Sequence, residues 1–145
     1  MSITVLKPGL QSTIQDLGRY NYSHFGISAS GAADPLSLQI GNMLIGNKKY
    51  ASAIEMTIIG GEFQFNVECY IAISGSEFDA ALDNNVITNH KAIKVSKGQT
   101  LSVGQTKTGA RVYLCVQGGI NVDSYLSSKS THILSGIGGH FGRPI

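Results

Sequence analysis

The chain has 145 residues, a net charge of +2, 42% hydrophobic residues and only 14% charged residues. Its lysines and arginines are scattered, which argues against nucleic acid or an anionic membrane as the main partner. No run of about 18 apolar residues is present for a membrane span. The N-terminal segment also lacks the apolar core of a signal peptide, so we expect a cytoplasmic protein.

Two short strands are expected at the N-terminus. The segment ITVLKPG predicts a strand that ends at Pro8-Gly9, and STIQDLGR predicts a short strand that leads into a turn at Gly18. The loop at residues 28–33 contains only Ser, Ala and Gly. Such a loop lets a neighbouring strand or a ligand approach its backbone closely.

A helix is predicted directly after this loop. Asp34 is a preferred N-cap residue, and Pro35 suits the first helical position, where its missing N–H costs nothing. Gly46-Asn47 suits the end of the helix. The large apolar residues recur at helical spacing and are expected to form an apolar stripe. They are Leu36, Ile40, Met43 and Leu44.

The rest of the chain predicts a series of strands. In EFQFNVECYIAISG apolar and polar residues alternate, which is typical of one or two strands with one solvated face. SEFDAALDNNVIT predicts a hairpin with its turn at Asp83-Asn84-Asn85. KAIKVSKGQTLSVG repeats this form with Lys97-Gly98 at the bend, and ARVYLCVQGGI alternates again. Many short strands with one or two short helices predict a mainly β barrel or sandwich.

The cysteines and histidines point to no special chemistry. Cys69 and Cys115 each lie in an expected strand, and we expect reduced thiols rather than a disulfide. The four histidines show no metal-ligand spacing, so no metal site is expected.

Three groups of polar residues are candidates for a site. Glu55 lies among apolar neighbours, where it is either the partner of an arginine or a general base with a raised pKa. Asp16 and Arg19 either form a pair that braces a turn, or Arg19 binds a carboxylate or phosphate. The segment SSKST, residues 127–131, is either a solvated loop or a cradle for an anion.

Several longer segments resemble one family. They are TIQDLGRYNYSHFGISASGAADPLSLQIGNMLIGN, AIEMTIIGGEFQF, and then LCVQGGINV, SKST and GGHFGRP in this order. Together they resemble the N-terminal part of the biotin-dependent carboxyltransferase-like family. That family includes the C subunit of bacterial ATP-dependent 5-oxoprolinase, a regulator that antagonises a sporulation-kinase inhibitor, and the matching domain of urea amidolyase and urea carboxylase.

The resemblance implies a cyclophilin-like β-barrel. Residues 1–145 would form a single cyclophilin-like domain, the N-terminal half of proteins that are normally about twice as long. It also implies a cytoplasmic enzyme subunit that works with subunits A and B of 5-oxoprolinase to open 5-oxoproline to glutamate. The full complex would use ATP with Mg²⁺, and no covalently bound cofactor is expected.

The resemblance also marks candidate site residues. Glu55 and Asp34 are the candidate catalytic carboxylates, and Ser30, Gly31 and Asp34 match the family motif SGAxDP. Asp34 can also serve chiefly as a helix cap. The expected substrate- and anion-binding residues are Arg19, Ser30, Gly31, Arg111, Ser128, Lys129, Ser130, Thr131 and Arg143.

One loop departs from the family pattern, which usually reads Gly-Ser-Arg-Ser/Ala-Thr where this chain has SSKST. Lys129 keeps the positive charge but loses the planar fork of an arginine. Ser127 is conformationally more restricted than a glycine. If this loop binds a carboxylate, its geometry therefore differs from that of the family.

Three functions follow as hypotheses. The first is a subunit of an ATP-dependent lactam hydrolase that acts on a small amide, with this chain inactive on its own. The second is a carboxyltransferase domain that acts on urea or a related amide and uses biotin carried by a partner. The third is a non-catalytic protein that sequesters a kinase inhibitor. Since the other half is absent, an exposed apolar face and self-association are also expected.

Overall fold

A single eight-stranded antiparallel sheet makes up most of the molecule in the computed structural model, which describes residues 2–145. Its strands are β1 (Ile3–Lys7), β2 (Ser12–Gln15), β3 (Ala53–Thr57), β4 (Glu62–Phe65), β5 (Cys69–Leu82), β6 (Asn85–Val86), β7 (Ile93–Val95) and β8 (Thr100–Val116). The helical elements are α1 (Pro35–Leu44) and the 3₁₀ turns η1 (Ser23–Phe25) and η2 (Ile133–Ser135). The predicted mainly β barrel-like fold with short helices is confirmed.

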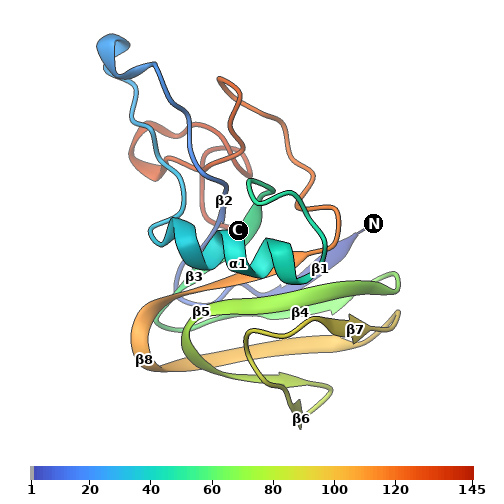
Figure 1. Ribbon diagram of the computed structural model, residues 1–145. Helices are drawn as coiled ribbons and strands as arrows, with labels where there is room; N and C mark the ends of the chain where they lie inside the picture. The colour runs from blue at the N-terminus through green and yellow to red at the C-terminus, as the bar shows by residue number, and fades with distance from the viewer. Residues whose placement is uncertain (1) are drawn as a thin grey trace.

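The long strands β5 and β8 lie side by side and give the sheet its curvature (Figure 1). Their register shifts several times between Gly75 and Ala80, and such bulges bend a strand and increase its twist. Along its other edge β8 pairs with β4 and then with β3, so that the strand order is β1-β4-β8-β3-β2. The sheet therefore curls into a half-barrel.

The inner face of the curled sheet holds the main apolar core. Its largest fully buried side chains are Met56, Phe63, Phe65, Ile71, Ile73, Leu101 and Leu114. The alternation predicted for β4 and β5 is confirmed, except that Val67 is 38% exposed. Val67 lies in the bend between these two strands, where side chains no longer alternate across a sheet.

Helix α1 begins and ends close to its predicted positions, with Asp34 as the N-cap. The Asp34 side chain accepts a hydrogen bond from the backbone N–H of Ser37 at 3.1 Å. The predicted apolar stripe, however, is not the buried face of the helix. Leu36 is 65% exposed and Met43 is 58% exposed.

The buried face of α1 consists of Leu38, Gly41 and Asn42. Gly41 faces Ser74 of β5 and Cys115 of β8, and a Cβ atom added to it would lie 2.7 Å from the Cys115 sulfur. Only a glycine lets the helix lie this close to the sheet. The contact at Gly41 therefore decides which face of the helix is buried, and helical spacing of large residues does not reveal it.

The predicted hairpin at Asp83-Asn84 is confirmed, since both residues adopt positive φ, 46° and 68°. The second predicted hairpin is wrong. Its bend at Lys97-Gly98 is present, but β7 pairs with β5, while β8 pairs with β3, β4 and β5. The two strands expected within residues 100–116 are one continuous strand, because the chain bends through its bulges without leaving the sheet.

Among residues 2–145, no helix is long and apolar enough to span a membrane.

Candidate functional site

Three neighbouring strands place polar side chains on the face of the sheet opposite the main core. Thr13 of β2 pairs with Glu55 of β3, and Glu55 pairs with Tyr113 of β8. Because side chains alternate along a strand, Gln15 and Arg111 lie on this same face. The register therefore gathers a carboxylate, a guanidinium, an amide and hydroxyl groups within a few residues of one another.

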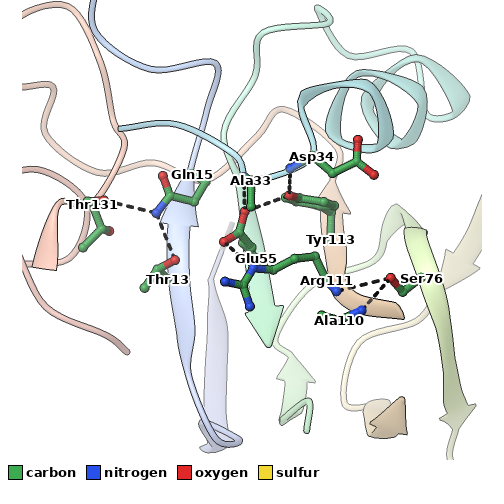
Figure 2. A network of polar contacts seen from close by, with 10 residues as sticks. All are labelled: Thr13, Gln15, Ala33, Asp34, Glu55, Ser76, Ala110, Arg111, Tyr113 and Thr131. Atoms are coloured by element: carbon green, nitrogen blue, oxygen red, sulfur yellow. Dashed lines mark hydrogen bonds and ion pairs between the residues drawn. The ribbon is translucent and has the colours of Figure 1, made fainter. Parts of the chain in front are cut away.

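The carboxylate of Glu55 is held by three groups (Figure 2). Its Oε2 accepts hydrogen bonds from the backbone N–H of Ala33 at 2.8 Å and from the hydroxyl of Tyr113 at 2.7 Å. Its Oε1 lies 3.5 Å from Nε of Arg111. The Glu55 side chain is only 9% exposed, and these partners meet the requirement of a buried charge. Arg111 is thus the arginine partner that the sequence left unspecified.

Tyr113 joins this carboxylate to the start of helix α1. Its side chain is fully buried, and its hydroxyl accepts a hydrogen bond from the N–H of Asp34 at 2.7 Å. Burial, with the nearby charge of Glu55, raises the pKa of Tyr113. The phenol is therefore a neutral donor to Glu55, and together these two side chains bind the last two N–H groups before the helix.

Arg111 is positioned by its own backbone. Ser76 accepts hydrogen bonds from the N–H groups of Ala110 and Arg111 at 3.1 and 3.2 Å (Figure 2). The Arg111 side chain is 34% exposed, and its Nε has no hydrogen-bond partner among the described residues. The guanidinium is thus paired in charge with Glu55 while it keeps donors for a further group.

A pocket of about 200 Å³ opens at this point. The sheet contributes Gln11, Thr13, Gln15, Glu55, Thr57 and Arg111, and the C-terminal segment contributes Thr131, His132, Ile133 and Leu134. This volume is below the roughly 300–1,000 Å³ of sites for drug-sized ligands. The pocket therefore suits a small metabolite, and it brings together three predicted residues: Glu55, Arg111 and Thr131.

The predicted anion loop binds a carboxylate of the chain itself. Asp16 accepts hydrogen bonds from the hydroxyl of Ser128 and the N–H groups of Gly18 and Lys129, each at 2.7 Å, and from the hydroxyl of Ser130. Burial raises the pKa of Asp16, but these four hydrogen bonds together outweigh it and hold the pKa below its usual value. The loop is thus a structural clamp around Asp16.

Arg19 and Lys129 also bind groups of the chain. The guanidinium of Arg19, a residue only 2% exposed, donates to the carbonyls of Ser130 and Tyr125. The ammonium of Lys129 donates to the carbonyl of Ile120 at 3.0 Å. Asp16 and Arg19 therefore brace their turn mainly against the C-terminal segment. The substrate- and anion-binding roles of Arg19, Ser128, Lys129 and Ser130 stay predictions.

The small-residue loop packs against backbone of its own chain. A Cβ atom on Gly31 would lie 2.9 Å from backbone atoms of Leu17 and Gly18. The N–H of Arg19 donates to the carbonyl of Ala29 at 2.7 Å. The close approach that the small residues allow is thus made by the turn after β2.

The remaining predicted residues lie in different settings. Ser30 is in the same small-residue loop, with φ at 53°. The Asp34 carboxylate caps α1. Arg143 has an exposed side chain and is outside the pocket lining. Catalytic or binding roles for these residues stay predictions.

Thiol and metal chemistry find no support. Cys69 and Cys115 are free and buried, as predicted, and burial raises the pKa of Cys115 to about 12. A thiol with such a pKa is a poor nucleophile. Within residues 2–145, no cluster of three His, Cys, Asp or Glu side chains could hold a metal ion.

Sequence reasoning missed Gln15 and Tyr113 as site residues. Both lie in strands at positions opposite to the core-facing phase, and that phase was readable from the neighbouring Ile14, Val112 and Leu114. A polar or aromatic residue in that phase is usually a surface residue, so only the strand pairing identifies these two.

Comparison with known proteins places this fold and site in one family. The family model described as "Carboxyltransferase domain, subdomain A and B" matches residues 25–145. The chain is 40% identical to the urea amidolyase of Saccharomyces cerevisiae over 98% of the chain and 8% of that protein. It is 38% and 36% identical to the 5-oxoprolinase C subunits of Haemophilus influenzae and Escherichia coli, over 97% of the chain and 46% of each.

A solved structure agrees with these matches. The crystal structure of the Kluyveromyces lactis urea carboxylase superposes with a TM-score of 0.97 and 37% sequence identity, over 99% of the chain and 13% of that protein. The chain spans about half the length of the bacterial 5-oxoprolinase relatives and a small part of the fungal proteins. These relatives are enzymes or enzyme subunits by name. The chain belongs to the carboxyltransferase-domain family, within its subdomains A and B.

Proposed function

We propose that this chain is part of the C subunit of a cytoplasmic ATP-dependent 5-oxoprolinase, which works with subunits A and B to open the lactam of 5-oxoproline to glutamate. The observation that carries the proposal is the pocket at Glu55 and Arg111. A paired carboxylate and guanidinium in about 200 Å³ suit a small molecule with a carbonyl group. The identity to two bacterial proteins named as 5-oxoprolinase C subunits supports the choice of substrate.

The chemistry assigns different roles to the two charged residues. A lactam is a stable amide, and negative charge develops on its oxygen when water attacks the carbonyl carbon. Arg111 donates to this oxygen, so that its charge stabilises the transition state more than the substrate. The Oε1 atom of Glu55 faces Arg111 and lacks the backbone and phenol bonds of Oε2. This oxygen orients the guanidinium and accepts a proton from the attacking water.

The pocket does not fit a nucleotide. Its volume of about 200 Å³ is too small for a nucleoside triphosphate, so we place ATP and Mg²⁺ in another part of the complex. ATP would supply the phosphoryl group that activates the carbonyl oxygen. This chain supplies the amide site alone and is expected to be inactive without its partners.

The test is turnover by the complete complex. The full gene product that contains this chain is co-expressed with subunits A and B, and 5-oxoproline and ATP are added. We expect glutamate and ADP to be released in equal amounts. Absence of turnover from an intact complex would reject the oxoprolinase assignment.

A matched pair of variants tests the role of the pocket. Arg111→Met should lower kcat by about 100-fold or more, as expected for loss of one oxyanion donor. Lys107→Met removes a positive charge from the same strand, where Lys107 forms an exposed ion pair with Asp79, and should leave turnover within about twofold of the unmodified protein. Equal effects of both changes would exclude a specific role for Arg111.

The second candidate is a carboxyltransferase that acts on urea or a related amide with carboxybiotin. The 40% identity to a urea amidolyase and the TM-score of 0.97 with a urea carboxylase favour it. Biotin would come on a partner domain and would supply the carboxyl group. Carboxylation of urea in the presence of a biotin-carboxylase partner, without hydrolysis of 5-oxoproline, would select this function. A stable complex with no reaction of either kind would select the third, sequestering function.

A further inference from the structure

Gln15 has an unpaired amide oxygen at the wall of the Glu55–Arg111 pocket. The residue is 6% exposed and belongs to the pocket lining. Within residues 2–145, its Oε1 has no hydrogen-bond partner. Native proteins leave few buried polar atoms unpaired. At the wall of a pocket, a ligand can supply the missing donor.

The orientation of this amide is determined by its other end. Nε2 of Gln15 donates to the hydroxyl of Thr13 at 3.0 Å and to the backbone carbonyl of Thr131 at 3.1 Å. A backbone carbonyl can only accept, so a flipped amide would set oxygen against oxygen at Thr131. Figure 2 shows Nε2 between these two partners and Oε1 pointing away from both. The free end of Gln15 is therefore an acceptor.

The neighbouring charged groups define what the pocket can recognise. Oε2 of Glu55 already accepts two hydrogen bonds, and its Oε1 faces Arg111. Arg111 keeps donors for an acceptor on a ligand, while Gln15 lacks a donor. A guanidinium donor and an amide acceptor in one small pocket are complementary to a C=O group bonded to N–H.

We propose that Gln15 is a specificity-determining residue of this site and accepts a hydrogen bond from the N–H of an amide substrate. The inference rests on the proposed function for the class of substrate. An ester or lactone oxygen carries no hydrogen and would face Oε1 as a second acceptor. A site built to bind an N–H rejects the analogue that lacks it, because the acceptor then stays unpaired.

The experiment compares two ligands that differ at one atom. Binding of 5-oxoproline to the chain is measured by calorimetry, beside its lactone analogue, 5-oxotetrahydrofuran-2-carboxylate. We expect the lactam to bind at least about tenfold more tightly. Gln15→Met, which keeps the length of the side chain but removes the acceptor, should weaken lactam binding to the level of the lactone and leave lactone binding unchanged.

Two further variants separate recognition from structure. Gln11→Met makes the same change at another residue of the pocket lining and should keep the preference for the lactam. Thr13→Val removes a partner of Nε2 while Oε1 stays in place, and it should also keep the preference. Loss of preference in Thr13→Val as well would show that Gln15 acts only by holding the fold.

The outcomes distinguish this inference from the proposed function. Equal binding of lactam and lactone by the unmodified chain overturns the inference, whether or not Gln15→Met folds. A preference that survives in Gln15→Met also overturns it, as does failure of both ligands to bind. Turnover by the full complex tests the proposed function separately, so a negative binding result leaves that test open.

Discussion

The hydroxyl of Tyr113 connects the carboxylate of Glu55 with the backbone that enters helix α1. It donates to Glu55 and accepts from Asp34, both at 2.7 Å, inside the fully buried part of the molecule. Neither partner can turn to water when this hydroxyl is absent. One side-chain oxygen thus holds the site and the start of the helix together.

Tyr113→Phe should therefore destabilise the protein, although it removes a single atom. The change leaves a buried N–H and a buried carboxylate oxygen each short of one partner, which costs about 1–3 kcal/mol. Urea denaturation measures the free energy of unfolding. Tyr70→Phe is the control, because Tyr70 is 43% exposed, and its effect should stay within about 0.5 kcal/mol. Equal stability of both variants would contradict the role assigned to Tyr113.

The four hydrogen bonds to Asp16 make the stability depend on pH. Burial alone would raise the pKa of Asp16, but these bonds lower it below the unfolded value of 3.8. The unfolded chain then binds a proton more readily than the folded one. Stability is fully present above the unfolded pKa and is lost as the pH falls through the lower, folded pKa.

Asp16→Asn tests this dependence. We expect the variant to be less stable than the unmodified protein at neutral pH and to lose less stability on acidification below about pH 4. Urea denaturation at a series of pH values measures both effects. Parallel pH profiles for the two proteins would show that Asp16 does not carry the dependence.

Helix α1 shows how a small residue can decide which side of an element is buried. Gly41 faces Ser74 and Cys115, while the larger Leu36 and Met43 face solvent. In an isolated helix, Gly→Ala stabilises by about 1 kcal/mol. In this chain the same change puts a methyl group 2.7 Å from the Cys115 sulfur, so the sign of the effect reverses.

Gly41→Ala should destabilise the protein by about 1–3 kcal/mol, as is usual for overpacking. Thermal denaturation followed by circular dichroism measures the change. Met43→Ala on the exposed side of the same helix should alter stability by less than about 0.5 kcal/mol. A stabilised Gly41→Ala variant would mean that the helix lies farther from the sheet than described.

The outer side of α1 affects the molecule as a whole. Leu36, Met43 and Leu44 are exposed together on one helix, and Phe25 and Tyr50 are exposed elsewhere. The chain also spans only 46% of its bacterial 5-oxoprolinase relatives. Contiguous exposed apolar side chains favour association.

We therefore expect the isolated chain to self-associate. Light scattering should give a mass above that of the monomer, and the mass should rise with concentration. The double variant Leu36→Glu with Met43→Glu should shift the chain toward the monomer, because charged side chains oppose burial of that face. A strictly monomeric unmodified chain would contradict the expectation.

The sequence by itself determined the features that depend on near neighbours. Strand positions follow from alternation, the bounds of α1 follow from Asp34 and Pro35, and the hairpin at Asp83-Asn84 follows from residues that tolerate positive φ. It also marked Glu55 as a carboxylate in need of a partner. Each of these signals acts within one turn or a few residues.

Only the tertiary structure decided which distant residues meet. The clamp around Asp16 joins residues 112 positions apart, and Tyr113 reaches Glu55 across 58 positions. The pairing of β7 with β5 and the buried face of α1 were likewise not readable from local patterns. The physical reason is that sheet register and the closest backbone approach result from packing of the whole chain, and no local periodicity of hydrophobic residues encodes them.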